Sequence, residues 1–529
     1  MSYVIFINML RGHKPLIPLL FPYGVPMRIF NSLSRGIDEF RPISDKKVMM
    51  YVCGITPYDR VHIGHARAYC AFDVLKRYLV KKGYRIFHIQ NITDVDDKII
   101  KRCKETGADP MRLTSENHDD ALSLFKKLNI LPADVYPKVT AHIPDITALI
   151  SKLIEKGKAY ETASGVYFDI SSFPAYGALS GQNLEEIKAG SRFDVDESKR
   201  SPGDFALWKK TQGEIIEFGS PWGRGRPGWH IECSAMAQRY AGRTLDIHGG
   251  ARDLIFPHHE NEIAQSEAAS GERFCNCWVH AGFLTVDGEK MSKSLGNFIT
   301  LEQALSKNSP NALRLFYLRA HYRSPLDYQE DEIDAMEESA ERIFNSLGLI
   351  REEIKEASAE TGKNGNNKND PGKKHQHKDE DFRKHSDSLV SSFYAQMDED
   401  LNTPEAIASL FSLLRLANTH LASGKPDLEQ LGRVRIAIED MLWILGLIEV
   451  KSALGQKLAP LQTLLKELGA PSQDIPNDPE KAIESIISLR DEARKKKDYA
   501  KSDLIRNRLK DIGIILEDKA GSGIRWKVE

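Results

Sequence analysis

In the early part of the chain, continuous apolar runs flank a stretch in which apolar residues recur at helical spacing. The apolar run "VMMYVCGI" at residues 48–55 is short and continuous, as expected for a buried strand. Apolar side chains then recur at helical spacing until Gly83, at Ala68, Phe72, Leu75 and Leu79. A second apolar run, "YRIFHIQNIT" at 84–93, predicts another strand. Strand, crossover helix and strand in this order predict the beginning of a doubly wound parallel sheet.

The pattern changes in the middle of the chain and then returns. Residues from about 137 to 221 have shorter apolar runs and many Gly, Ser and Asp residues. Strand-like runs resume at 245–257 and 278–286. We therefore predict an α/β, Rossmann-like domain over residues 27–335, interrupted by an insertion at about 137–221.

Beyond this domain the pattern is mainly helical and predicts an all-helical bundle over residues 336–460. Almost no apolar residue occurs at 361–381, so we expect a solvated linker within the bundle. Residues 479–529 combine a basic helical stretch with a strand-like tail, which predicts a small C-terminal α/β domain.

Composition narrows the class of protein. The 529 residues are 41% hydrophobic, which is enough for several domains with their own cores. Six irregularly spaced cysteines do not make a disulfide framework and favour a reducing, cytoplasmic location. With a net charge of -2, the chain would have to bind a nucleic acid through a local basic patch. No apolar run of about 18 residues occurs, so we expect no membrane-spanning segment.

Residues 1–26 are apolar but interrupted by prolines, and they lack the cationic start and cleavage site of a signal peptide. We expect an N-terminal extension that is disordered or not translated. Met27 is the alternative start of translation.

The segment "HIGH" at residues 62–65 is a candidate nucleotide site, because it joins a predicted strand to a predicted helix. His62 and His65 can hydrogen-bond a phosphate as charge spreads in a transition state, and Gly64 lets a nucleotide approach the backbone. The N-terminus of the helix also favours anions. The structural alternative is a pair of histidines that only caps a helix.

The segment "KMSKS" at residues 290–294 is a second candidate, in a polar loop between a predicted strand and a predicted helix. Lys290 and Lys293 can bind a triphosphate and stabilise departing pyrophosphate. A run of lysine and serine is usually only a hydrated loop. The two segments in this order, on opposite sides of an insertion, are much harder to obtain by chance.

With these two segments, the chain resembles the class I aminoacyl-tRNA synthetases. This resemblance implies an enzyme that activates an amino acid with ATP and Mg²⁺ and transfers it to tRNA. It implies catalytic roles for His62, His65, Lys290 and Lys293. It also implies that ATP contacts His62, Gly64, His65 and Lys293.

The chain also contains a candidate metal site made of Cys53, Cys233, His258 and Glu262. The last two are four residues apart, so they share one face of a predicted helix. Thiolate, imidazole and carboxylate ligands together suit Zn²⁺ in tetrahedral geometry. The alternatives remain open: a lone cysteine is more often a buried apolar residue, and His259 could replace His258 as Glu260 could replace Glu262.

These four residues give the chain a closer resemblance to the cysteinyl-tRNA synthetases. The resemblance implies one Zn²⁺ per chain on these ligands, at the floor of the pocket for L-cysteine, whose thiol joins the metal. It implies synthesis of cysteinyl-adenylate and transfer of cysteine to tRNA(Cys). Direct metal ligation can discriminate against serine by more than the about 1–3 kcal/mol that a pocket of contacts provides.

The same resemblance implies that four residues surround the cysteine substrate: Thr56, Thr93, Trp229 and His248. It also places Asp253 near the adenylate. Trp229 and His248 could otherwise be ordinary packing residues.

The basic stretch of the C-terminal domain predicts contact with tRNA phosphates through Arg494, Lys495, Lys496 and Lys497. The family resemblance implies that residues 479–529 form an anticodon-binding domain, in which Trp526 could stack on an unpaired base of the tRNA. The structural alternative is a solvated helical face.

Two other classes of function fit less well. A ligase that joins cysteine to a small amine would use the same pocket, but it would not need the basic C-terminal domain. A binding protein that keeps only the fold would not need His62, His65, Lys290 and Lys293. We expect a monomer.

Overall fold

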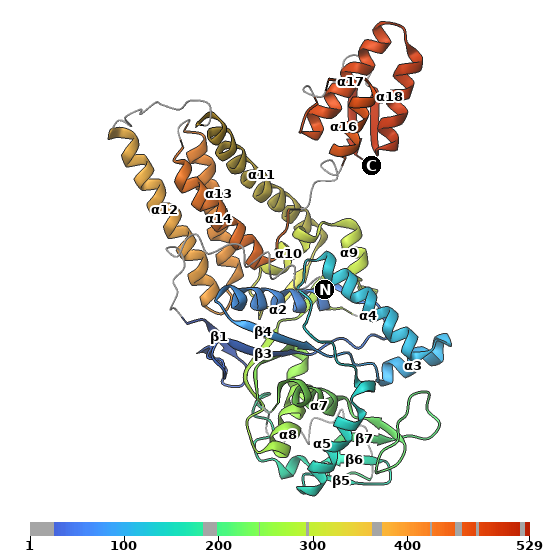
Figure 1. Ribbon diagram of the computed structural model, residues 1–529. Coiled ribbons are helices and arrows are strands. Elements are labelled where there is room, and N and C mark those ends of the chain that lie inside the picture. The colour runs from blue at the N-terminus through green and yellow to red at the C-terminus, as the bar shows by residue number, and fades with distance from the viewer. Residues whose placement is uncertain are drawn as a thin grey trace. The chain divides into compact units, whose positions relative to one another are not determined.

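The computed structural model describes residues 26–182, 198–242, 244–291, 296–361, 373–423, 426–449, 457–471, 475–518 and 524–528. The chain forms two compact units, Met1–Ile448 and Glu449–Glu529 (Figure 1). The expected extension, residues 1–26, lies outside the described residues except for Pro26.

The first unit is built on a parallel sheet of four strands in the order β10-β9-β3-β4. These strands are β3 (Lys47–Val52), β4 (Arg85–Gln90), β9 (Leu245–Ala251) and β10 (Cys275–Ala281). The first two are joined by the crossover helix α2 (Ile63–Lys81), as the apolar pattern predicts. The chain builds outward from β3 in one direction and from β9 in the other, so the order reverses between these two strands. Ligands of doubly wound sheets bind at such a reversal, at the carboxyl ends of the strands.

The two faces of this sheet support separate hydrophobic cores. Helix α2 packs in the core on one face, where Ala66, Phe72, Leu75 and Leu79 are all buried. Helices α5 (Ile143–Glu155), α7 (Trp229–Ala241) and α8 (Glu260–Ser270) pack in the other core (Figure 1). This layering confirms the predicted Rossmann-like fold.

The segment between β4 and β9 begins with α3 (Asp97–Thr106), α4 (Pro110–Lys127) and α5. It continues as an antiparallel sheet of β5 (Ala159–Glu161), β6 (Gly165–Phe168), β7 (Phe205–Lys210) and β8 (Gly225–Pro227). The predicted insertion end near residue 221 is therefore wrong, because Pro227 still pairs with Trp208 of the neighbouring strand. Proline is tolerated on such an edge strand, which needs no outward donor.

A smaller sheet lies beyond β10 and contains β11 (Leu284–Val286), β12 (Glu289–Lys290) and β13 (Leu326–Tyr328). Helices α9 (Leu301–Lys307) and α10 (Pro310–Leu318) come between β12 and β13 in the chain. A two-stranded ribbon, β1 (Arg28–Asn31) with β2 (Gly36–Glu39), precedes the main sheet. Met27, which directly precedes β1, is buried.

Four long helices complete the first unit: α11 (Glu330–Thr361), α12 (Lys373–Asp398), α13 (Thr403–Leu421) and α14 (Leu428–Leu445). They share one core with α2 and α10. The predicted linker at 361–381 is too long, because α12 already begins at residue 373. Phe382 and Val390 anchor the later part of this helix in the core. The polar residues at its start extend the same helix.

The second unit contains α16 (Leu458–Glu467), α17 (Pro479–Lys495), α18 (Tyr499–Asp511), β14 (Ile514–Asp518) and β15 (Ile524–Val528). Leu461, Leu464 and Leu465 of α16 pack in one core with Ile483 and Ile505. The predicted boundary at residue 479 is therefore wrong, as is the assignment of residues up to 460 to the helical bundle. Apolar residues of α16 complete the small core of the C-terminal unit.

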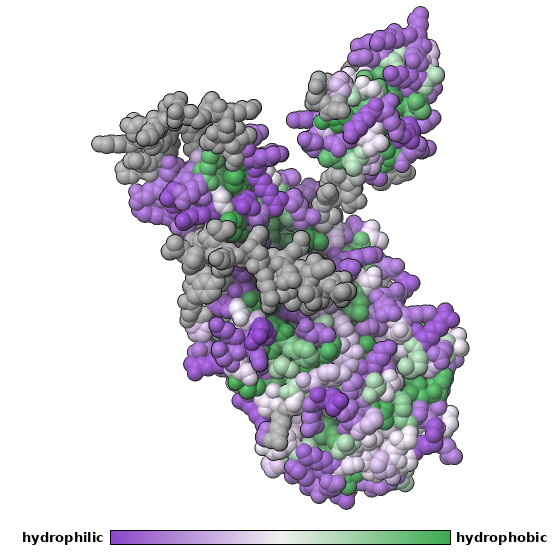
Figure 2. All heavy atoms as spheres, viewed as in Figure 1, coloured by the Kyte–Doolittle hydropathy of each residue, from purple (hydrophilic) through white to green (hydrophobic). Residues whose placement is uncertain are grey.

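None of the helices in the described part of the chain has the length and apolarity needed to cross a membrane. Figure 2 shows hydrophilic and apolar side chains intermixed on the face of the molecule that it presents.

Candidate active site and metal centre

The candidate site lies where the order of the main sheet reverses. Cys53 directly follows β3, and its N–H donates to the carbonyl of Gly249 in β9 at 3.0 Å. The next residue must be glycine, because a Cβ on Gly54 would lie 1.6 Å from the carbonyl oxygen of Asn91. Close packing of the loops after β3 and β4 thus places Cys53 at the reversal point.

Four side chains that the sequence proposes as metal ligands meet at this point: Cys53, Cys233, His258 and Glu262. One ligand atom of each lies within 4.8 Å of the others, and all four residues are buried. They come from the end of β3, from α7, from the wide helical turn η4 (Ile255–His259), and from α8. The last two elements are continuous in the chain, so the tertiary structure gathers residues from three separate segments.

The spacing of these atoms is close to that of a tetrahedral zinc site. Two sulfur atoms at about 2.3 Å from Zn²⁺ would lie about 3.8 Å apart at the tetrahedral angle. The Sγ atoms of Cys53 and Cys233 are 4.0 Å apart, and Sγ of Cys53 is 3.7 Å from Oε1 of Glu262. Nε2 of His258 is 3.0 Å from the same oxygen. Two sulfurs, one nitrogen and one oxygen are a donor set that fits Zn²⁺.

The electrostatics of the cluster favour charged ligands. Burial raises the pKa of Glu262, but His248 and His258 outweigh burial and lower this pKa to about 2. Burial also opposes ionisation of Cys233, yet a hydrogen bond from Cys53 and the charge of His258 lower its pKa to about 6. A carboxylate and a thiolate are thus available in an apolar pocket, where a divalent cation would neutralise them.

A second set of possible ligands overlaps the first and contains Cys53, His248, His259 and Glu262. Nε2 of His259 is 3.2 Å from Sγ of Cys53, while its Nδ1 is 2.8 Å from Nε2 of His280. His248 is fully buried, and its Nε2 lies 2.8 Å from Oε2 of Glu262. The set with both thiols contains His258, which favours His258 over His259 as the metal ligand.

The two signature histidines, His62 and His65, stand at the start of α2 with their ring centroids 3.8 Å apart. Nδ1 of His62 accepts the N–H of Gly64 at 3.1 Å, and Nδ1 of His65 accepts the N–H of His62 at 3.3 Å. Burial lowers the pKa of His62 to about 4 and lowers the pKa of His65 well below its usual value. Both rings are therefore neutral at pH 7 and carry their proton on Nε2, as donors for a phosphate.

The "KMSKS" segment at residues 290–294 is called the lysine segment below. The chain that follows it returns to His62 and His65. Ile63 donates its N–H to the carbonyl of Ile299, and Leu301 donates to the carbonyl of Val61. A Cβ on Gly64 would come within 3.0 Å of the His62 ring and 3.6 Å of the Met291 methyl group. Lys293 lies outside the described residues, and only the backbone of Lys290, paired with Thr285, is described.

The residues expected around the cysteine substrate and the adenylate differ in exposure and in their contacts. Trp229 is 38% exposed, and its ring centroid is 4.2 Å from that of His258, so it covers the candidate ligands.

The threonines and Asp253 lie in the segments that follow the strands. Thr93 is buried, donates its N–H to the carbonyl of Ile55 and accepts a hydrogen bond from Asn91. Thr56 is half-buried in the loop after β3. Asp253 is exposed in the short helix η3 (Arg252–Leu254), next to the end of β9.

In the C-terminal unit, Arg494 and its three neighbours Lys495, Lys496 and Lys497 are exposed at the end of α17. Trp526 pairs with Leu516 across β14 and β15 and packs partly against the core of this unit. Its packing role is thus visible, whereas contact with a base stays a prediction.

Three functional candidates do not follow from the sequence reasoning: His230, His280 and Tyr51. Nδ1 of His230 is 3.0 Å from Nδ1 of His258, and His280 holds His259. Tyr51 is fully buried two residues before Cys53, and its ring centroid is 5.0 Å from that of His248. The available signal was their position, because Tyr51 and His280 lie near the carboxyl ends of β3 and β10 and His230 lies in the first turn of α7.

Family models match most of the first unit. The model of the tRNA synthetases class I (C) catalytic domain matches residues 39–338. The DALR domain matches residues 392–449, within the helical bundle.

Individual relatives agree with the family models. A cysteine–tRNA ligase of Thermococcus onnurineus is 43% identical over 504 residues, 95% of this chain and 99% of the relative. One from Heliobacterium modesticaldum is 44% identical over 506 residues, with the same coverage. The methionyl-tRNA synthetase of Mycobacterium tuberculosis has a similar fold, with a TM-score of 0.56 at 16% identity over 81% of this chain and 95% of that one. On these similarities, the chain belongs to the cysteine–tRNA ligase family of class I tRNA synthetases.

Proposed function

We propose that the protein activates L-cysteine with ATP and transfers the cysteinyl group to tRNA(Cys). The observation that carries this proposal is the buried set of two thiols, an imidazole and a carboxylate at the reversal point of the sheet. Helix α2, which bears the two signature histidines, is tied to this set, because the hydroxyl of Tyr69 donates to the carbonyl of Cys53 at 3.0 Å. Recognition of a thiol and chemistry on ATP can therefore occur side by side.

We propose that Cys53, Cys233, His258 and Glu262 hold one Zn²⁺. When bound, the metal would supply an acceptor for the thiolate of L-cysteine, which a serine hydroxyl replaces poorly. Trp229 lies over His258 and would form one wall of the pocket for the substrate side chain. From the family resemblance, we propose that Thr56, Thr93 and His248 also surround the cysteine substrate in this pocket.

The signature histidines fit the activation step. In this step a carboxylate oxygen of cysteine attacks the α-phosphorus of ATP, and pyrophosphate leaves. Neutral His62 and His65 can donate their Nε2–H groups to the phosphate oxygens as negative charge shifts onto them. We propose that Gly64 and Asp253 contact the nucleotide, that Lys290 and Lys293 stabilise the departing pyrophosphate, and that Mg²⁺ accompanies ATP.

In the second step, a hydroxyl of the terminal ribose of tRNA attacks the carbonyl carbon of the adenylate, and AMP leaves. The exposed basic end of α17 supports a tRNA partner, because Arg494, Lys495, Lys496 and Lys497 can pair with phosphates. We propose that Trp526 adds a stacking contact. We propose a monomer, in a reducing cytoplasm that preserves the buried thiols.

The test is ATP–pyrophosphate exchange with each of the common amino acids in turn. We expect exchange only with cysteine, and cysteine-dependent charging when tRNA(Cys) is added. Exchange with serine at comparable efficiency would contradict selection by a metal-bound thiol. Exchange with cysteine but no charging of any tRNA would instead favour a ligase for a small amine.

A further inference from the structure

Arg67 is a buried cation on α2, two residues after His65 and only 3% exposed. Its guanidinium donates to three main-chain carbonyls. One nitrogen bonds the carbonyl of Gly282 at 3.1 Å and also that of Phe283, and another bonds the carbonyl of Ser324. Burial lowers its pKa to about 10, so the group stays charged at neutral pH.

The three acceptors lie at the start of the small sheet. Gly282 and Phe283 directly precede β11, and Ser324 lies just before β13, the parallel neighbour of β11. These two segments approach closely, because a Cβ on Gly282 would lie 2.3 Å from the carbonyl oxygen of Ser324. One guanidinium thus holds both strands where they enter the sheet.

This sheet carries the backbone of Lys290, which pairs with Thr285 of β11. The residues after the lysine segment are fixed separately, since Ile299 and Leu301 bond to the chain at Val61 and Ile63. Backbone hydrogen bonds of Ile299 and Leu301 therefore join the later part of this chain to the start of α2. Lys290 is joined to the same helix through β11 and Arg67.

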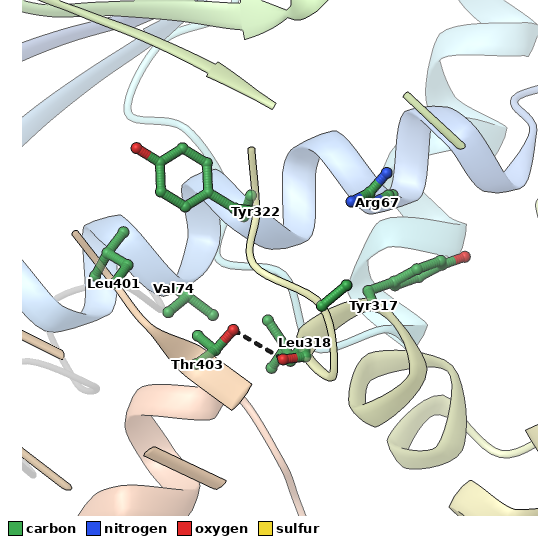
Figure 3. A pocket seen from close by; sticks show the side chains of 9 residues that line it. Arg67, Val74, Tyr317, Leu318, Tyr322, Leu401 and Thr403 are labelled. Atoms are coloured by element: carbon green, nitrogen blue, oxygen red, sulfur yellow. Dashed lines mark hydrogen bonds between the residues drawn. The ribbon is translucent and has the colours of Figure 1, made fainter. Parts of the chain in front are cut away.

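We propose that Arg67 is a positioning residue that sets the distance between the two signature histidines and Lys290, and so aligns the triphosphate of ATP. This inference rests on the proposed function. The hydrogen bonds that the structure describes for Arg67 all go to main-chain oxygens, from the planar fork of donors that a guanidinium provides and a lysine does not. Figure 3 shows it on α2 near Tyr317 of α10, which together with Arg67 lines a small cavity. Loss of the fork would let the small sheet shift relative to α2.

The test compares Arg67→Lys with Arg77→Lys. Arg77 is the control because it lies on the same helix, is 2% exposed, and donates to the carbonyls of Asn129 and Trp443 as well as to the buried carboxylate of Asp73. In pyrophosphate exchange we expect Arg67→Lys to raise KM for ATP about tenfold and to lower kcat, since small misplacements of reacting groups are costly. KM for cysteine and zinc content should stay within about twofold of wild type, because the metal cluster lies on other elements.

Binding of a sulfamoyl analogue of cysteinyl-adenylate supplies a second measurement. The analogue lacks pyrophosphate, so its Kd should be the same for Arg67→Lys and the wild type, although ATP binds less well. An equal rise in KM for ATP in Arg77→Lys, or equally weakened binding of the analogue by Arg67→Lys, would overturn the inference in favour of general destabilisation. If the wild type shows no cysteine-dependent exchange, the proposed function fails instead.

Discussion

His248 hydrogen-bonds one carboxylate oxygen of Glu262, and the other oxygen of Glu262 points toward the remaining candidate metal ligands. Its Nε2 lies 2.8 Å from Oε2 of Glu262, while Oε1 faces His258 at 3.0 Å. Both side chains are fully buried, and the His248 ring stacks on Trp278 with centroids 4.6 Å apart. The orientation of a proposed metal ligand thus depends on a residue that does not need to touch the metal.

The first prediction concerns this relationship. His248→Phe should keep the stacking on Trp278 but lose the hydrogen bond to Glu262. Loss of such an outer partner typically costs about 10–100-fold in metal affinity. The rate of zinc release to a colorimetric chelator measures this effect. His118→Phe, in the ring contact with Tyr136 outside the cluster, is the control, and equal release rates for the two variants would refute the role of His248.

The second prediction separates a ligand thiol from a buried thiol. Cys233→Ala should lower the zinc content from one per chain to nearly none and abolish cysteine-dependent pyrophosphate exchange, because a tetrahedral site needs all its ligands. Cys275→Ala should retain both, since Cys275 is equally buried but belongs to neither ligand set. Elemental analysis and the exchange assay give the two readings. Full zinc and activity in Cys233→Ala would exclude the proposed centre.

The third prediction follows from the lowered pKa of His62. The folded state binds a proton at about pH 4, whereas an unfolded histidine binds one near its usual pKa of 6.5. The unfolded chain therefore holds more protons between these values, and the stability that neutral His62 contributes, present above about pH 6.5, is lost as pH falls toward 4. The loss is at most about 3 kcal/mol for this one group.

The variant His62→Asn tests this point, because asparagine still caps a helix but does not titrate. Denaturant unfolding at pH 7 and pH 5 should show a smaller drop in unfolding free energy than in the wild type. His385→Asn, at an exposed histidine, should leave the drop unchanged. An identical drop in all three proteins would mean that His62 is not held neutral by the fold. Exchange activity of His62→Asn should also fall by about 10²–10³, as for loss of a transition-state donor.

The fourth prediction concerns a buried ion pair between α2 and α10. Arg314 and Asp73 are 2.6 Å apart and fully buried, and Arg314 also donates to the carbonyl of Leu445 in α14. Arg314→Met should destabilise the first unit by about 3–5 kcal/mol, because it leaves a buried carboxylate with less compensation. The exposed pair of Arg28 with Glu399, at 2.9 Å, is the control, and Arg28→Met should cost at most about 1 kcal/mol. Similar costs for both, measured by thermal or denaturant unfolding, would contradict this ranking.

The fifth prediction concerns the C-terminal unit. Removal of residues 449–529 should leave cysteine-dependent pyrophosphate exchange intact, because this unit has its own core and contributes no residue to the cluster. Charging of tRNA(Cys) should weaken strongly. Replacing Lys495, Lys496 and Lys497 by glutamine in the full chain should lower tRNA affinity. It should also reduce the slope of log K against log salt concentration by an amount that corresponds to up to about three phosphate contacts. Unchanged charging by both proteins would remove the proposed tRNA role of this unit.

The residue order by itself predicts the doubly wound sheet and its interruption, because strand and helix periodicities are local properties of the chain. It also predicts the set of Cys53, Cys233, His258 and Glu262 as candidate ligands, which the fold brings together. The relatives confirm the family that the signature segments indicate. Boundaries were less predictable, since α12 is anchored by Phe382 and Val390 beyond its polar start and α16 packs in the core of the C-terminal unit.

Only the tertiary structure decides how neighbours of identical chemistry divide their roles. His258 and His259 are adjacent in the sequence, yet His258 lies against Trp229 in the ligand set that has both thiols, while His259 contacts Cys53 and His280. Likewise, no local pattern relates Arg67 to the carbonyls of Gly282 and Ser324, more than two hundred residues away. The physical reason is the strand order β10-β9-β3-β4, which places the ends of distant segments side by side, where hydrogen bonds and burial then select each partner.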